Sequence, residues 1–142
     1  MILPDVNVLI YAFRRDSVRH AEYRAWLQGV ADGPNAYGVS PQVLASVLRI
    51  CTHSKIFRQP STVTETLAFC EALLEPAHST LIHPGARHWS IFTDLCESSN
   101  ASGNLVQDAW FAALAIENGC QWISTDVDYD RFCGLRWQRP FE

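Results

Sequence analysis

The hydrophobic and polar positions of the chain predict helices that alternate with short strands. Apolar side chains recur every three or four residues in several segments, which is typical of amphipathic helices, and brief apolar runs stand between them. The expected helices cover residues 17–30, 41–51, 62–74, 85–96 and 104–118. The expected strands cover residues 1–3, 37–39, 80–82, 122–124 and 135–137, and the pattern assigns no element to residues 6–16.

Residue types at the segment ends support three of these helices. Ser40 and Pro41 supply an N-cap followed by a proline at the first helical position. Thr62, with Glu65 three residues later, has the spacing of a capping box. Gly119 suits the left-handed position that commonly follows the last turn of a helix.

Strands that alternate with helices predict an α/β fold with a central, mostly parallel sheet covered on both faces. No repeat or linker divides the sequence, so residues 1–142 are expected to form a single domain. In open sheets of this kind, ligands bind beyond the carboxyl ends of the strands. Asp5 and Asp126 each follow an expected strand, so the two carboxylates are predicted to meet at the same sheet edge.

The composition is that of a globular protein with a substantial core, since 48% of the residues are hydrophobic and 18% are charged. No apolar stretch approaches the ~20 residues of a membrane span, and no leader segment is recognisable, so we expect a cytoplasmic protein. The net charge of −4 requires any phosphate-binding surface to be local. Free thiols are expected of the five scattered cysteines, Cys51, Cys70, Cys96, Cys120 and Cys133.

Three aspartates alternate with other residues just after the last well-defined apolar run, at Asp126, Asp128 and Asp130. A calcium loop starts in this way, but its sixth position needs Gly and its twelfth needs Glu, and here they are Arg131 and Trp137. Two interpretations stay open for this run. It is either a solvated turn or one wall of a metal site completed by other parts of the chain.

Asp108 is the acid whose surroundings are most unusual. It lies in the stretch VQDAWFAALAI, where only Gln107 and Asp108 have fully polar side chains, and a helix that is apolar nearly all round is buried. An isolated buried carboxylate costs several kcal/mol, and a place in the first helical turn would offset only about 0.3–1 kcal/mol of that cost. Asp108 therefore either faces solvent beside Gln107 or shares a divalent cation with other acids.

Asp5 supports the second interpretation of Asp108. It is the only charged residue in ILPDVNVLIYAF, although a turn in which it bonds locally with Asn7 is the simpler explanation. Carboxylates that converge from three separate elements form a hard-oxygen site suited to Mg²⁺ or Mn²⁺. Asp5, Asp108 and Asp126 are the predicted members of such a site.

Four segments in order resemble one known family: PDVNVLIYA, SPQVLASVLRICTHSKIF, GNLVQDAWFAALAIENG and STDVDYDRFCGLRW. Together they are similar to PIN-domain endoribonucleases, specifically VapC-type toxins of toxin–antitoxin pairs. The resemblance implies a three-layer α/β/α PIN-like fold. It also implies that Asp5, Asp108 and Asp126 bind the catalytic metal, with Asp128 as an accessory acid. The family has a glutamate where this chain has Ser46, a poorer ligand for Mg²⁺.

The activity that the resemblance implies is Mg²⁺- or Mn²⁺-dependent endoribonuclease cleavage of tRNA or rRNA loops, in which water attacks the phosphate in line and the 3′-oxygen leaves. It further implies a homodimer held inactive by a VapB-type antitoxin. The candidates for gripping RNA phosphates are Arg14, Arg15 and Arg49, with Lys55 and Arg58 nearby in the sequence.

Two rival functions stay open at this point. A haloacid-dehalogenase-like phosphohydrolase also begins with an acid at the first strand end, but its second acid is here Asn7 and its late lysine is missing, because Lys55 is the only lysine. A PIN domain that binds RNA or a partner without cutting is the other rival. Ser46 favours that rival, and retention of the three mutually repelling acids Asp5, Asp108 and Asp126 opposes it.

Overall fold

The computed structural model describes residues 1–142 and has a single five-stranded sheet in which every neighbouring pair is parallel. The strand order is β3-β2-β1-β4-β5, so β1 and β4, which are distant in sequence, are neighbours at the centre. This confirms the predicted α/β fold with a parallel sheet. The strands are β1 (Ile2–Pro4), β2 (Tyr37–Val39), β3 (Ser79–Leu81), β4 (Gln121–Ile123) and β5 (Trp137–Gln138).

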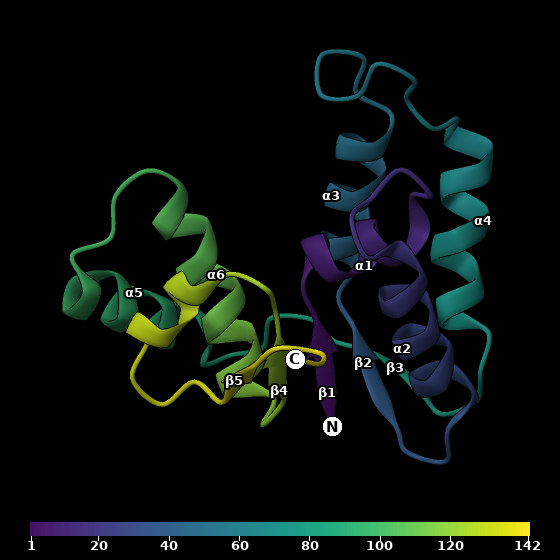
Figure 1. Ribbon diagram of the computed structural model, residues 1–142. Helices are drawn as coiled ribbons and strands as arrows, with labels where there is room; N and C mark the ends of the chain where they lie inside the picture. The colour runs from purple at the N-terminus through teal and green to yellow at the C-terminus, as the bar shows by residue number, and fades with distance from the viewer.

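Six α-helices and one 3₁₀ helix flank the sheet in two groups. Figure 1 shows α5 and α6 together on the side of β4 and β5, and α1 to α4 together on the side of β2 and β3. None of these helices combines the length and apolarity that crossing a bilayer demands. The helices are α1 (Val6–Phe13), α2 (His20–Asp32), α3 (Pro41–Cys51), α4 (Val63–Leu74), α5 (His88–Ser99) and α6 (Asn104–Glu117), and the 3₁₀ helix is η1 (Val127–Arg131).

The expected helix ends are present and explain why these helices begin and end where they do. Ser40 Oγ accepts a hydrogen bond from Val43 N at the start of α3. Thr62 and Glu65 form both bonds of a capping box at the start of α4. Gly119 follows α6 with a φ of 64°, a left-handed conformation that costs a residue with a Cβ more than it costs glycine.

The helix α1 is the main element that the sequence pattern did not assign. Its residues are mostly apolar, three of the eight are β-branched, and five are buried, so no polar stripe marks a helical period. Asp5 precedes it and caps it, because the Asp5 side chain accepts a hydrogen bond from Val6 N. Most other differences are shifts of one to three residues at element ends, as at α2, which starts at His20, and β5, which starts at Trp137.

The core brings α6 close to the sheet. The alanines at positions 109, 112, 113 and 115 are all fully buried, and Trp122 of β4 packs its ring against Phe111 at a centroid distance of 5.4 Å. Small side chains let a helix approach its neighbours, so these alanines fix the position of α6, and with it Asp108, relative to the end of β4.

Candidate metal centre

The neighbouring strands β1 and β4 place their carboxyl ends side by side. Pro4 pairs with Ile123, and the chain continues so that Asp5 N donates a hydrogen bond to Ile123 O at 2.8 Å. Asp5 is therefore the first residue beyond β1, and Ser124 is the first beyond β4. Both residues are buried, Asp5 at 5% exposure and Ser124 at 0%.

Ser124 joins two of the predicted acids. Its hydroxyl donates a hydrogen bond to Asp5 Oδ2 at 2.6 Å and accepts one from Asp126 N at 3.0 Å. A buried hydroxyl that uses its donor and an acceptor in this way holds both neighbours in place. The relative position of Asp5 and Asp126 is thus set by Ser124.

Three carboxylates lie closest together: Asp108, Asp126 and Asp128 each offer an oxygen, and these atoms are all within 4.8 Å of one another. Asp126 also caps η1, because its Oδ1 accepts a hydrogen bond from Asp128 N at 2.9 Å. The turn that begins η1 therefore brings Asp126 and Asp128 together, and α6 supplies Asp108 from across the sheet edge.

Asp108 lies in the second turn of α6, since that helix begins at Asn104. The expectation that it occupies the first turn was wrong, and the helix dipole adds little there because its effect falls off within that turn. Asp108 is half-buried, whereas Gln107 beside it is exposed. Its Oδ1 accepts a hydrogen bond from the Tyr129 hydroxyl at 3.3 Å.

Burial and mutual repulsion make two of these acids harder to ionise. Burial, together with the charges of Asp108 and Asp126, raises the pKa of Asp5 to about 6, although hydrogen bonds from Ser124 and Val6 oppose the rise. Burial and the charge of Asp126 raise the pKa of Asp108 to about 6 as well. Burial and the surrounding carboxylates also raise the pKa of Tyr129, whose hydroxyl stays protonated.

The acids have almost no protein cation to offset them. The one basic group within ion-pair distance is Arg131, whose Nη2 lies 3.6 Å from Asp128 Oδ1, and both side chains are at least half-exposed. No basic side chain forms an ion pair with Asp5, Asp108 or Asp126. The arrangement is therefore one of converging negative charges that a bound cation would stabilise.

The donor chemistry fits a hard divalent cation. Asp108, Asp126 and Asp128 offer only carboxylate oxygens, which Mg²⁺ and Mn²⁺ prefer, and neither His nor Cys belongs to the group. Asp5 stands just outside this tight group. Its two oxygens already accept hydrogen bonds from Val6 N and from Ser124, but each carboxylate oxygen keeps a second lone pair.

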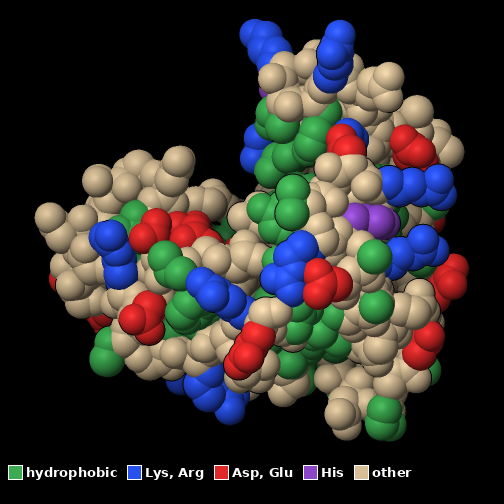
Figure 2. Space-filling model, viewed as in Figure 1, with side chains coloured by type: hydrophobic (Ala, Val, Ile, Leu, Met, Phe, Trp, Pro, Cys, Tyr) green, Lys and Arg blue, Asp and Glu red, His purple; other side chains and the backbone are tan.

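Helix α3 contacts α6 through one side-chain pair. Gln42 Oε1 accepts a hydrogen bond from Trp110 Nε1, and Ser46 follows Gln42 by one helical turn. Ser46 is half-buried, and its hydroxyl makes no hydrogen bond. Figure 2 shows acidic side chains grouped beside a hollow that separates the α5–α6 side of the surface from the α1–α4 side.

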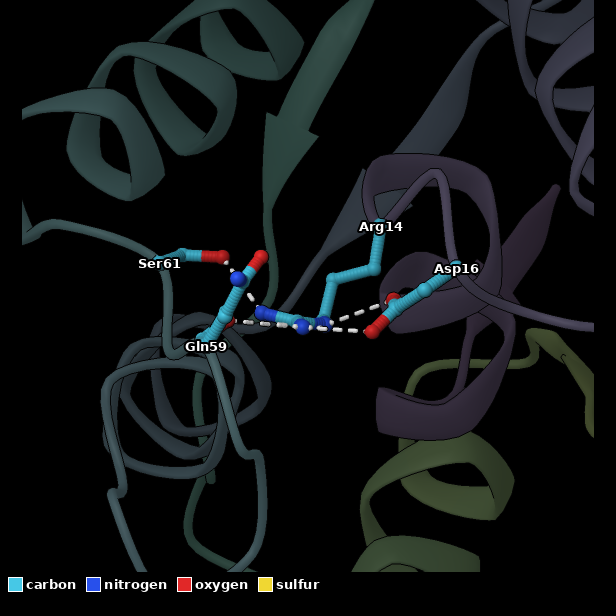
Figure 3. A network of polar contacts seen from close by, with 4 residues as sticks. All are labelled: Arg14, Asp16, Gln59 and Ser61. Atoms are coloured by element: carbon cyan, nitrogen blue, oxygen red, sulfur yellow. Dashed lines mark hydrogen bonds and ion pairs between the residues drawn. The ribbon is translucent and has the colours of Figure 1, made fainter.

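Arg14, one of the three predicted RNA-binding arginines, is buried at 7% exposure and bonded within the protein (Figure 3). Its guanidinium donates to both carboxylate oxygens of Asp16, at 3.0 and 2.7 Å, to Ser61 Oγ at 2.8 Å and to Gln59 O at 3.0 Å. It also stacks over the Phe57 ring at 3.6 Å. Four of the five N–H donors of Arg14 are thus occupied, which leaves little for a phosphate.

The other two arginines predicted to bind RNA are placed differently. Arg15 and Arg49 are exposed and form no ion pair, and Lys55 and Arg58 are exposed as well. Arg49 lies on α3, three residues after Ser46, and its side chain is exposed. Its guanidinium is therefore free to contact an anion.

A cavity of about 760 Å³ lies away from the acids. It lies between α2, α4 and the end of α1, and its lining includes Arg15, His20, Arg24, Leu27 and Phe69. None of the four clustered acids lines this cavity. The chemistry of the converging carboxylates, rather than cavity size, identifies the candidate metal centre.

The sequence analysis did not find two residues of this centre, Ser124 and Tyr129. Their positions in the sequence offered a weak signal. Ser124 lies at the end of an expected strand, two residues before Asp126, and Tyr129 lies between two acids of the alternating run. A polar or aromatic residue of this kind is common, so its role is apparent only when Asp5 and Asp108 are brought beside it.

Comparison with known proteins identifies the same family over the whole chain. The family model for the PIN domain matches residues 2–135. Ribonuclease VapC43 of Mycobacterium tuberculosis is 37% identical over 142 residues, which cover 100% of this chain and 97% of that protein. Ribonuclease VapC31 of the same species is 38% identical over 140 residues, 99% of either chain.

Solved structures agree on the fold. VapBC2 of Rickettsia felis, determined with a promoter DNA fragment, aligns over 98% of both chains with a TM-score of 0.69 and 19% identity. VapC20 of M. tuberculosis, described as a sarcin-ricin loop cleaving toxin, aligns over 96% of this chain and 99% of its own with a TM-score of 0.65 and 17% identity. The chain therefore belongs to the PIN-domain family, in its VapC group.

Proposed function

We propose that this protein is a divalent-metal-dependent endoribonuclease and the toxin of a toxin–antitoxin pair. The observation that carries the proposal is the convergence of Asp108, Asp126 and Asp128 within 4.8 Å, with Asp5 beside them and almost no basic side chain among them. Full-length relatives named ribonucleases, at 37–38% identity, support the reaction.

The carboxylates of Asp108, Asp126 and Asp128, with Asp5 next to them, would hold Mg²⁺ or Mn²⁺. When bound, such an ion supplies a water of lowered pKa and neutralises charge on the scissile phosphate. The protein itself fixes the acids before substrate arrives, through the Ser124 hydroxyl between Asp5 and Asp126 and through the Asp126 cap of η1. Hydrolysis adds the oxygen of water to phosphorus and releases the 3′-oxygen, so no covalent enzyme intermediate is required.

Substrate recognition is assigned to exposed cations in the α1–α4 part of the molecule. Arg49 and Arg15, with Lys55 and Arg58, are exposed and would contact phosphates on either side of the cleaved bond. Arg14 stays a weaker candidate because its donors are used within the protein. Loops of tRNA or rRNA are the proposed substrates, and mapping the cleaved bond in total RNA identifies which of them is cut.

A VapB-type antitoxin is the proposed inhibitor, and a homodimer is the proposed assembly. A basic side chain inserted among the four acids would meet uncompensated negative charge, which is a simple electrostatic match. Structural neighbours include VapBC complexes from R. felis and Haemophilus influenzae. Light scattering of the purified chain measures whether it is a dimer.

The test is cleavage of tRNA and rRNA by the purified chain in Mn²⁺ and in EDTA. We expect cleavage only with the metal, and Asp126→Asn should lower the rate by on the order of 1000-fold, about 4 kcal/mol of transition-state stabilisation. Asparagine keeps a side-chain oxygen for the cap of η1, so this variant should fold.

Asp94→Asn is the matched control, because Asp94 is an exposed acid on α5 that makes no side-chain hydrogen bond or ion pair. It should cut RNA as the wild type does. Cleavage that persists in EDTA would contradict metal dependence. RNA that is bound but left intact in Mn²⁺ would instead support a PIN domain without catalytic activity, and phosphate released from small monoesters would support a phosphohydrolase.

A further inference from the structure

Tyr129 is buried beside the acid cluster and contacts it through one polar atom. The residue is 2% exposed, and its hydroxyl donates a hydrogen bond to Asp108 Oδ1 at 3.3 Å. That is the only hydrogen bond of the hydroxyl, and no other protein group donates to the Asp108 side chain. The hydrogen bond joins η1 to α6, and β4 lies between these two elements in the sequence.

The Tyr129 ring is held rigidly by aromatic neighbours. The Trp122 ring lies 5.4 Å from it and the Phe132 ring 6.0 Å, centroid to centroid. Trp122 is fully buried and Phe132 is 3% exposed, so the ring cannot swing away without disturbing the core. The hydroxyl is therefore a fixed donor at the inner side of Asp108.

We propose that the Tyr129 hydroxyl is a positioning group for the ion site: it holds Asp108 Oδ1 from the protein interior and leaves the remaining lone pairs of that carboxylate for a divalent cation. This inference rests on the proposed function, because it concerns the same site.

The strength of the contact sets the size of the expected effect. Groups that hydrogen-bond to metal ligands orient them, and their removal typically lowers metal affinity about 10- to 100-fold. A separation of 3.3 Å is longer than the about 2.5–3.0 Å usual for bonds between a hydroxyl and an oxygen acceptor. The effect should lie at the lower end, about tenfold in the dissociation constant of the ion.

Tyr37 provides a matched control, because it too is a buried tyrosine with a single hydroxyl hydrogen bond. It is 1% exposed, and its hydroxyl donates to Leu73 O at 2.6 Å, between β2 and α4 and remote from the acids. Replacing either tyrosine by phenylalanine removes one buried hydroxyl and keeps the ring. Both variants should lose resistance to urea, so stability alone does not separate them.

The experiment is a calorimetric titration of Mn²⁺ into the purified chain without RNA, for the wild type, Tyr129→Phe and Tyr37→Phe. We expect Tyr129→Phe to raise the Mn²⁺ dissociation constant about tenfold and Tyr37→Phe to leave it unchanged. In an Asp108→Ala background, Tyr129→Phe should cause no further change, because the carboxylate that it positions has been removed.

A dissociation constant for Tyr129→Phe within about twofold of the wild type would overturn the proposal, as would an equal rise in Tyr37→Phe. Its failure is distinguishable from failure of the proposed function. If the wild-type protein cleaves RNA but binds no Mn²⁺, the role proposed for Tyr129 is refuted, whereas the ribonuclease activity stands. Tight Mn²⁺ binding that depends on Tyr129 but is accompanied by no RNA cleavage supports the role and refutes the ribonuclease.

Discussion

The molecule contains two groups of charged side chains that are partly or fully buried, and they differ in how charge is balanced. At the end of α1, the Arg14 guanidinium meets Asp16, Ser61 and Gln59, and its hydrogen bonds hold the pKa of Asp16 below its usual range. At the carboxyl ends of β1 and β4, negative groups meet one another, and the pKa values of Asp5 and Asp108 rise to about 6.

The difference separates a network that stabilises the fold from the site that is proposed to bind a cation. A folding network satisfies its own donors and acceptors, so nothing further is needed at Arg14. The acid cluster is left with unmet negative charge, and such strained sites are retained where a ligand relieves them. The raised pKa values of Asp5 and Asp108, beside the lowered pKa of Asp16, support the proposal that the acid cluster is the functional group.

The largest effect on stability is expected for Arg14→Met, which deletes the balanced network. Ser61 Oγ and Gln59 O lose their donor and Phe57 loses the stacked guanidinium, so the free energy of unfolding should fall by about 2–3 kcal/mol. The ion pair itself adds little, because the Asp16 side chain is 60% exposed. Urea unfolding measures the loss.

Arg15→Met is the control for this change, since Arg15 is the exposed neighbour of Arg14 and should shift stability by less than about 0.5 kcal/mol. If Arg14→Met keeps wild-type stability and instead loses affinity for RNA, the network does not stabilise the fold and Arg14 binds phosphate. The distinction between a stabilising network at Arg14 and a binding site at the acids would then be wrong.

The next effect is on the pH dependence of stability in the absence of metal. The pKa of Asp5 is about 6 in the folded protein and 3.8 in an unfolded chain, so as pH rises the folded state loses this proton at a higher pH than the unfolded state does. Between about pH 4 and 6 the unfolded chain ionises first, so the free energy of unfolding falls as pH rises, by about 2 kcal/mol from pH 4.5 to 7.

Other acids titrate in the same range, and the lowered pKa of Asp16 acts in the opposite direction. The measurement is therefore the difference between wild type and Asp5→Asn in EDTA at pH 4.5 and 7. The wild type should lose more stability than the variant over this interval, and saturating Mn²⁺ should remove the loss. If the stability difference between the wild type and Asp5→Asn is the same at pH 4.5 and at pH 7, the pKa of Asp5 is not raised in the folded protein.

The smallest effect is expected for Ser46→Glu, which adds an acid on the α3 side. A fifth carboxylate near the cluster should tighten Mn²⁺ binding about fivefold, roughly 1 kcal/mol, and raise the cleavage rate. Ala45→Glu is the control, because Ala45 is the exposed neighbour on the same helix. Equal affinities in both variants would mean that the acids already on the α6 and η1 side complete the site.

Hydrophobic periodicity was sufficient to predict the parallel α/β architecture and most helices, because amphipathic helices and buried runs reveal their faces in the sequence. It failed at α1, whose residues Val6–Phe13 are apolar on nearly every side and contain β-branched types that favour strands. The capping role of Asp5 was the available signal, and it was hidden because Asp5 also looked like the end of a strand.

The candidate site was predictable residue by residue, but its contacts were not. The chemistry of the residues suggested that Asp5, Asp108 and Asp126 share a cation, and the resemblance added Asp128 as an accessory acid. The sequence could not show that Asp5 is held by Ser124 and lies outside the tightest group, or that Tyr129 donates to Asp108. Such contacts depend on strand register and helix position, which are set by packing across the whole core.

The pairing of β1 with β4 joins the start of the chain to its last part, since Ser124 contacts an acid 119 residues earlier. During synthesis, Asp5 leaves the ribosome long before Asp126 and Asp128 exist, and any chain that ends before residue 121 lacks the central strand β4. Such a chain holds at most Asp5 and Asp108 of the acid cluster. The strand order therefore leaves the proposed metal centre incomplete until β4 and η1 have been made.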